Sequence, residues 1–438
     1  MTPVQGAARL ALAGAMLLAA VPAQAQLIRT RPFQGIFRTT QDPADSRDRI
    51  DVRAFVAAGH DESSLEVGGV DVPLDDRLRT ATFGSLLVTG AYVHTGRRTS
   101  FSANGGTATR YYQGLPGGLT PLNATGGVQF SGSAGRRGSF ALNGSAAYSP
   151  YYTFSLAPRL QLEEPAEAAP VFDPDTDLRA ARRATYSYDA GASYSHRFAR
   201  RSQLQLAYGS QYVNSVEGAY DLLSQHASVR LAQDLGRQMG LYVGYGARLS
   251  DYVASPFQEV VAHDLDAGFS YARTLPFARR TRIALAAGSG FIVQHEARRF
   301  FVSGNASLHH QFTRTWSAAL AYSRGNAVLH GFAAPFFTFS DSVGLSVLGR
   351  LVGPVTLSTF GSYSHGTFSV QSVKNVVDSG SGSVRINVPV IWFLSAYVEG
   401  YYAEYRFARR VGLLDDMPQA TSRFGTRAGL TFLLPVLR

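Results

Sequence analysis

The sequence predicts an all-β fold: a transmembrane, antiparallel, up-and-down β-barrel of about 18 strands. Three observations lead to this prediction. The chain opens with an export signal, most of the remainder alternates between apolar and polar residues, and short turns alternate with longer connections. The export signal indicates secretion, the alternation indicates β-strands, and the turn lengths indicate the orientation of the barrel.

Residues 1–25 have the pattern of a cleaved secretory signal peptide. Arg9 supplies a positive charge, residues 10–21 form a short apolar run, and Ala23-Gln24-Ala25 is a small-x-small cleavage site. The apolar run is too short to span a bilayer and lacks charged stop-transfer flanks, which argues against an N-terminal anchor. We expect the mature chain to start at Gln26, with residues 26–49 as a short periplasmic segment and residues 50–438 as the barrel.

Strict alternation marks the strands. Between residues 185 and 194, tyrosine and alanine hold every even position, while Thr, Ser, Asp and Gly hold every odd one. A period of two is the strand period, because successive side chains leave opposite faces. Polar faces rich in Gly, Ser, Gln and Asn predict a wet lumen, and apolar faces predict contact with lipid. Aromatic residues near segment ends, such as Tyr186, Tyr194, Trp316, Tyr322 and Trp392, are typical of interfacial girdles.

The pattern from residue 50 to residue 438 contains nine hairpins, which gives 18 strands; 16 is the alternative if one terminal pair is misread. The predicted strands span residues 50–60, 81–94, 99–112, 122–134, 139–153, 182–196, 202–214, 222–235, 239–252, 261–274, 281–294, 299–312, 316–328, 337–350, 355–366, 376–388, 392–405 and 420–434.

Connection lengths predict the orientation. The connections after even-numbered strands are short, whereas those after odd-numbered strands are mostly longer. The short connections are Thr95–Arg98, Gly135–Gly138, Arg197–Arg201, Gly236–Gln238, Leu275–Arg280, Thr313–Thr315, Leu351–Pro354 and Pro389–Ile391. Outer-membrane barrels keep short turns in the periplasm, so both termini are expected there.

Composition excludes several other classes. The net charge is +10, and Lys374 is the only lysine. The arginines are spread along the chain instead of forming one basic face, so no nucleic-acid partner is expected. A β-propeller has a similar repeat length, but it needs four short strands per repeat and Trp-Asp signatures that the sequence lacks.

No catalytic, metal or cofactor site is predicted, and the chain is not expected to be an enzyme. His263 and His365 lie near strand ends beside Asp264 and Ser364. Neighbours in a strand point to opposite faces, so these pairs cannot meet. There is no cysteine, and His309-His310 diverge for the same reason, which leaves no metal-ligand spacing.

Charged residues at inward positions are the candidate site. Opposed charges across a lumen filter solutes; the alternative is that they only pair and keep the lumen wet. The predicted lumen-lining residues are Arg230, Arg248, Arg282, Arg385, Arg423, Asp189, Asp264, Asp266 and Glu399. The alternation places Arg427 on the inward face as well.

Two further features lie at the predicted ends of the barrel. The third external loop, residues 154–181, is acidic and either folds inward as a constriction or forms a surface loop. Its acidic residues are Glu163, Glu164, Glu167, Asp173, Asp175 and Asp177. Arginine pairs at 97–98, 136–137, 200–201 and 279–280 lie on the predicted periplasmic rim, as soluble turns or as a docking surface for a periplasmic partner.

The last strand contains Arg427-x-Gly429-x-x-Phe432-x-Leu434, which resembles the C-terminal assembly signal of bacterial outer-membrane proteins. It departs from that pattern by continuing to Arg438 instead of ending on an aromatic residue. The chain as a whole resembles outer-membrane barrels of the porin class. The segment Arg200–Tyr208 is loosely similar to barrels found with exopolysaccharide export systems.

We expect a passive channel for small hydrophilic solutes, with a mild anion preference if the arginine excess lines the pore. An energised transporter is not expected, because residues 26–49 are too few for a plug domain. A polysaccharide export channel and a barrel enzyme or surface receptor acting through its loops are the alternatives. The implied partners are outer-membrane lipid, lipopolysaccharide and the barrel-assembly machinery, with homo-oligomerisation left open and no cofactor.

Overall fold

The computed structural model describes most of the region predicted as barrel. The described residues are 48–67, 70–71, 80–113, 122–149, 152–153, 179–181, 184–215, 221–236, 238–253, 260–275, 278–294, 297–329, 336–370, 373–407 and 420–437. The predicted signal peptide and the acidic residues of the predicted constriction loop lie outside them.

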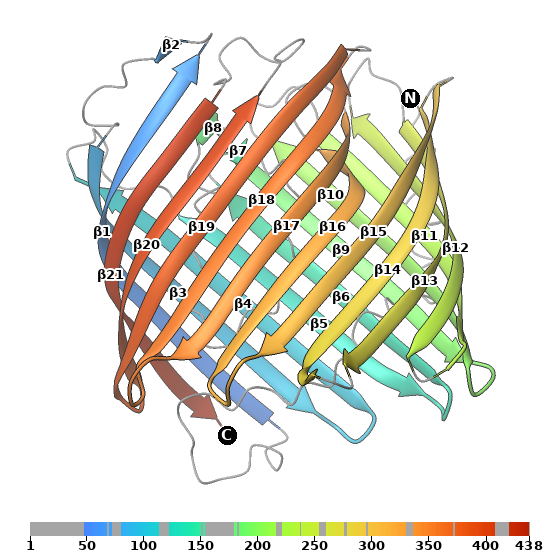
Figure 1. The fold of residues 1–438 in the computed structure, drawn as a ribbon, viewed down its shortest axis with the longest axis horizontal. Helices are drawn as coiled ribbons and strands as arrows, with labels where there is room; N and C mark the ends of the chain where they lie inside the picture. The colour runs from blue at the N-terminus through green and yellow to red at the C-terminus, as the bar shows by residue number, and fades with distance from the viewer. Residues whose placement is uncertain are drawn as a thin grey trace, which may run out of the picture.

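Eighteen long strands form one closed antiparallel barrel, in which each strand pairs with the next long strand along the chain (Figure 1). The strands are β1 (Asp48–Val67), β3 (Thr80–Thr95), β4 (Thr99–Tyr112), β5 (Asn123–Ala134), β6 (Gly138–Ser149), β9 (Thr185–Arg197), β10 (Ser202–Ser215), β11 (Asp221–Asp234), β12 (Met239–Val253), β13 (Val260–Leu275), β14 (Ala278–Gln294), β15 (Ala297–Gln311), β16 (Trp316–Leu329), β17 (Phe336–Arg350), β18 (Thr356–Val370), β19 (Val373–Ile391), β20 (Leu394–Phe407) and β21 (Ala420–Leu437).

The first and last strands close the barrel. β21 pairs with β1 from Ile50↔Leu437 to Glu66↔Ala420, so no long strand leaves an unpaired edge. Three short strands, β2 (Val70–Asp71), β7 (Tyr152–Thr153) and β8 (Arg179–Ala181), were not predicted; β2 extends β1, and β7 pairs with β8. The predicted count of 18 is confirmed and the alternative of 16 is wrong.

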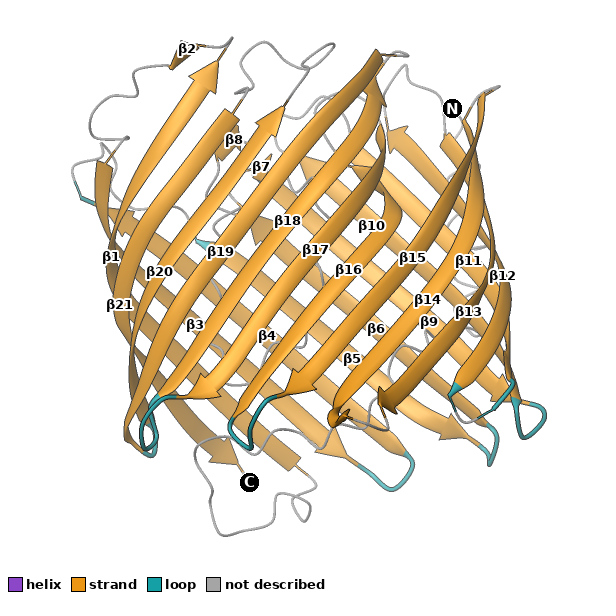
Figure 2. Ribbon diagram, viewed as in Figure 1, coloured by secondary structure: helices purple, strands orange, loops and turns teal. Residues whose placement is uncertain are grey.

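The short hairpin turns gather at one end of the barrel, where β1 begins and β21 ends (Figure 2). Gly135 and Gly353 have φ of 74° and 55° in two of these turns, a backbone conformation that favours glycine. Two predicted turns are wrong in their bounds. Arg280 belongs to β14, because β13 and β14 stay paired as far as Leu275↔Ala278 through a register shift. Pro389–Ile391 belongs to β19, because β19 and β20 stay paired as far as Ile391↔Leu394 through another register shift.

Apolar side chains cover the outside of the barrel, as predicted. Val398, Val302 and Leu265 are 60%, 53% and 51% exposed. Many inward positions carry small polar residues that hydrogen-bond between neighbouring strands, such as Ser342 with Ser364 at 3.0 Å. An apolar exterior around a polar interior is the pattern of transmembrane β-barrels. Within the described ranges, no helix is long and apolar enough to cross a membrane.

Tyrosines hydrogen-bond to carboxylates on the outer face. The hydroxyl of Tyr322 donates to Asp341 at 2.5 Å, and that of Tyr363 donates to Asp378 at 2.7 Å. Aromatic rings with a polar tip favour a membrane–water interface, where one end is apolar and the other wet. These pairs therefore form part of the aromatic girdle that the sequence predicts.

Candidate functional site: two walls of the lumen

Every predicted lumen residue occupies an inward position. Arg230 lies between Val229 and Leu231, which are 39% and 43% exposed on the outer face, and Asp264 and Asp266 flank the exposed Leu265. The residues separate into two groups. Figure 1 shows β1 and β19–β21 on one side of the barrel and β11–β13 on the other. We call them the packed wall (β19–β21, β1, β3 and β4) and the open wall (β11–β14).

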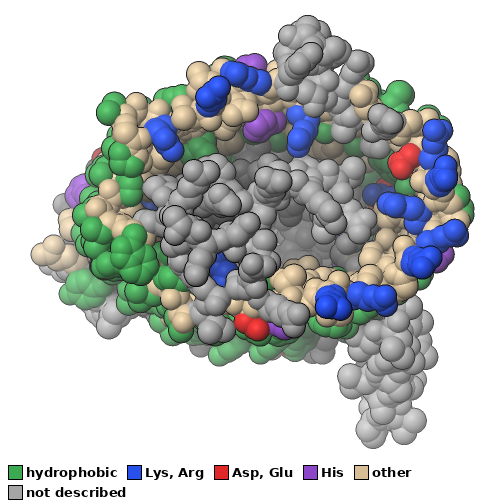
Figure 3. Space-filling model, turned by 90° about the horizontal axis from the view of Figure 1, so that it is seen from below, with side chains coloured by type: hydrophobic (Ala, Val, Ile, Leu, Met, Phe, Trp, Pro, Cys, Tyr) green, Lys and Arg blue, Asp and Glu red, His purple; other side chains and the backbone are tan. Residues whose placement is uncertain are grey.

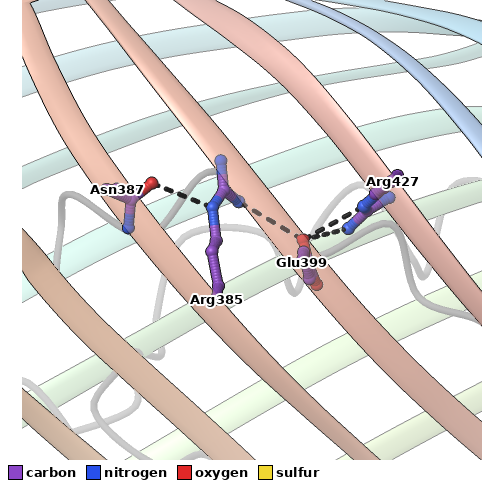
Figure 4. A network of polar contacts seen from close by, with 4 residues as sticks. All are labelled: Arg385, Asn387, Glu399 and Arg427. Atoms are coloured by element: carbon purple, nitrogen blue, oxygen red, sulfur yellow. Dashed lines mark hydrogen bonds and ion pairs between the residues drawn. The ribbon is translucent and has the colours of Figure 1, made fainter.

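The packed wall contains a buried charge network (Figure 4). Arg427 donates from Nε and Nη2 to Glu399 Oε2 at 3.0 and 2.9 Å, and Arg385 Nη1 lies 3.8 Å from the same oxygen. Arg385 Nε also donates to Asn387 Oδ1 at 3.0 Å. The side chains of Arg385, Glu399 and Arg427 are 4%, 1% and 2% exposed. One carboxylate therefore balances two guanidinium groups away from water.

A second buried pair joins the first and last strands. Arg423 Nε donates to Asp61 Oδ2 at 2.9 Å, Nη2 forms an ion pair with the same atom, and the Tyr401 hydroxyl donates to it at 3.2 Å. Arg423 belongs to β21 and Asp61 to β1. The contact therefore adds a side-chain link to the backbone ladder that closes the barrel.

Aromatic rings stack against the arginines of this wall. The guanidinium carbon of Arg385 lies 3.7 Å from the centroid of the Tyr397 ring, and that of Arg110 lies 4.4 Å from the Phe83 ring. Glycine makes room for one of these rings: a Cβ on Gly59 would lie 2.6 Å from Phe83 Cζ. Cation–π contact and burial together make this wall a core.

The open wall carries similar residues in a wetter setting. Arg230 forms an ion pair with Asp266, and the two side chains are 47% and 26% exposed. The guanidinium of Arg230 lies 4.7 Å from the centroid of Tyr242, whose hydroxyl donates to the Ala287 carbonyl at 2.9 Å. The side chains of Arg230 and Asp266 are therefore accessible from the lumen.

Two further arginines of the open wall have no acidic partner among the described residues. Arg248 lies opposite His226 in the β11–β12 ladder, and Arg282 lies opposite His309 in the β14–β15 ladder. Within the described ranges, neither arginine forms an ion pair with a carboxylate. Arg282 is exposed and Arg248 is half-buried. The open wall therefore presents cationic groups to the lumen.

The remaining predicted residues play smaller parts. Asp189 accepts a hydrogen bond from Ser145 at 3.3 Å. Arg427 and Gly429 of the predicted assembly signal face inward and Leu434 is exposed outward; Arg427 belongs to the packed wall, and the assembly role stays a prediction. His365 does not meet Ser364 but hydrogen-bonds to Asp378 across the β18–β19 ladder at 2.7 Å.

Some members of the packed wall were not predicted. Asp61, Arg110, Phe83, Tyr397 and Tyr401 all occupy inward positions. The strand alternation could have identified Asp61 as inward. Its contact with Arg423 could not be predicted in this way, because the two residues lie 362 positions apart. Among the described residues, no group of His, Asp or Glu could hold a metal ion.

Comparison with known proteins adds little beyond the barrel shape. No protein-family model and no curated protein sequence matches the chain. A siderophore receptor PirA from Acinetobacter baumannii shares 8% identity at a TM-score of 0.44, over 89% of this chain and 81% of that chain. OpdQ from Pseudomonas aeruginosa shares 9% at 0.44, over 91% and 100%. OccAB3 from A. baumannii shares 10% at 0.43, over 90% and 100%.

At such identities and TM-scores, these structures indicate nothing about the solute or activity of this chain. The function of this chain is therefore inferred from the side chains of its own barrel.

Proposed function

We propose that this chain is an outer-membrane channel through which small hydrophilic solutes diffuse passively, with a mild preference for anions. In this proposal, residues 1–25 direct export, the short-turn end lies in the periplasm and the apolar exterior contacts lipid. The support comes from the closed 18-stranded barrel, since barrels of this size leave an aqueous lumen.

The observation that carries the anion preference is the open wall. Arg248 and Arg282 have no carboxylate partner in the described ranges, and the neighbouring Arg230 is paired with Asp266. Uncompensated positive charge on a lumen wall raises the local concentration of anions and lowers that of cations. The packed wall also holds more arginines than acids, but its side chains are buried.

Reversal potentials in planar bilayers test the proposal. The full chain is expected to give stable single-channel steps. In a KCl gradient, its reversal potential should have the sign of the chloride equilibrium potential. Arg248→Gln with Arg282→Gln is expected to lower the chloride-to-potassium permeability ratio by about two-fold. Folding is checked in each case by the shift in gel mobility between unheated and heated samples.

A matched control removes two arginines from the outer face. Arg324 and Arg406 are ion-paired with Asp341 and Glu404, so R324Q/R406Q should leave the permeability ratio unchanged. A folded barrel without conductance would overturn the channel and favour a receptor or enzyme acting through its loops. An unaltered ratio in R248Q/R282Q would overturn the role of the open wall.

A further inference from the structure

Arginines lie along much of the rim of the barrel at the short-turn end (Figure 3). Three turns carry adjacent pairs of exposed arginines, and the fourth pair of the sequence, 279–280, lies in β14. Single exposed arginines lie at strand ends and in another turn. The paired residues are Arg97, Arg98, Arg136, Arg137, Arg200 and Arg201, and the single ones are Arg197, Arg280, Arg314 and Arg350. Within the described part of the chain, none of them forms an ion pair with a carboxylate. This arginine rim has no role in the channel proposed above.

The turns that carry the arginine rim are linked to one another. The carbonyl oxygen of Arg98 accepts from Ser133 N at 2.9 Å, and that of Arg137 accepts from Arg197 N at 2.9 Å. The Arg201 carbonyl accepts from Asp234 N at 2.7 Å. These hydrogen bonds run from one hairpin to the next, so they hold the backbone of the rim at fixed positions. A fixed backbone loses less conformational entropy when the rim binds a ligand.

Large apolar side chains are exposed among these arginines. Phe198, Phe312 and Trp392 are 48%, 55% and 59% exposed in the turns. Arg137 Nη1 donates to the Phe198 carbonyl at 3.5 Å and Arg280 Nη1 to the Phe312 carbonyl at 3.3 Å. Guanidinium groups and aromatic residues therefore share one level of the barrel. A purely aqueous docking surface for an acidic protein has no need of these exposed rings, whereas a membrane–water interface accommodates both.

We propose that the arginine rim binds the phosphate groups of anionic phospholipids in the leaflet that faces the short turns. Guanidinium matches phosphate through two parallel hydrogen bonds, and a cationic segment near an anionic leaflet is attracted to its surface. Acids beside basic partners are more frequent on the opposite half of the outer face, at Asp341, Asp378 and Glu404, whereas the described residues of the short-turn half include Asp48 beside His94. The inference rests on the proposed placement in a membrane.

Spin-labelled lipids test this inference. The full chain is refolded into phosphatidylcholine vesicles that contain a trace of spin-labelled phosphatidylglycerol or phosphatidylcholine, and the immobilised fractions are compared. We expect phosphatidylglycerol to associate about three-fold more strongly. The preference should fall towards one when all six paired turn arginines are replaced by Gln, and it should weaken at high salt.

R324Q/R406Q is again the matched control, because it removes two arginines that already have acidic partners, and it should keep the lipid preference. If the six-residue variant does not fold, R200Q/R201Q should still lose a measurable part of the preference. A folded six-residue variant with the wild-type lipid preference would overturn the proposal and favour an acidic periplasmic protein as the ligand. The readout is lipid association, so a barrel that conducts no current tests this inference equally well.

Discussion

The packed wall and the open wall use the same residue types to different effect. On the packed wall, Arg385 and Arg427 share Glu399, and all three side chains are almost fully buried. On the open wall, Arg230 pairs with Asp266 while both remain in contact with water. Burial decides the difference, because a charge taken out of water must have a partner, whereas a solvated one need not. The packed wall therefore serves stability, and the open wall is free to act on solutes.

Removing one acid from each wall gives the largest expected contrast. Glu399→Gln removes the carboxylate that the buried Arg385 and Arg427 share, so we expect a loss of about 3–5 kcal/mol in the free energy of unfolding. Asp266→Asn frees a solvated arginine and should cost less than about 1 kcal/mol. Urea unfolding of the vesicle-embedded barrel, followed by tryptophan fluorescence, measures both. Equal costs for the two variants would show that the walls do not differ as described.

Two inward glycines test the packing of the walls separately from their charge. A Cβ on Gly59 would lie 2.6 Å from both Phe83 Cζ and the Thr426 carbonyl oxygen, whereas one on Gly246 would meet no atom closer than 3.6 Å. Gly59→Ala should therefore cost about 1–3 kcal/mol because backbone or ring must shift. Gly246→Ala should change stability by less than about 0.5 kcal/mol. The same unfolding assay decides, and a neutral Gly59→Ala would mean that Phe83 has room to move.

Much of this contrast lies beyond what the sequence alone can predict. Alternation and turn lengths predicted the barrel, its 18 strands and the inward position of Arg385, Glu399 and Arg230, because these depend on local periodicity. The link between Asp61 and Arg423 depends on closure between the first and last strands, and the burial of one wall depends on the packing of several strands. The alternation along a strand predicts which way a side chain points, but it does not predict whether water reaches that side chain.

In the smallest expected effect, a substitution on the open wall costs more stability than the matched one on the packed wall. Tyr242 on the open wall donates its hydroxyl proton to the Ala287 carbonyl at 2.9 Å. Tyr397 on the packed wall stacks on Arg385, and within the described part of the chain its hydroxyl has no hydrogen-bond partner. Tyr242→Phe should cost about 0.5–1.5 kcal/mol, since it removes this hydrogen bond to the Ala287 carbonyl. Tyr397→Phe keeps the ring over the guanidinium and should fall within about 0.5 kcal/mol of the parent.

Unfolding of both variants under identical conditions measures this reversal. A larger loss for Tyr397→Phe would indicate that burial on the packed wall magnifies every change, including the removal of an atom without a hydrogen bond. The expected order instead follows from the partner that each polar atom has. On this argument, the packed wall is sensitive where its charges and glycines make close contacts, and it tolerates change where they do not.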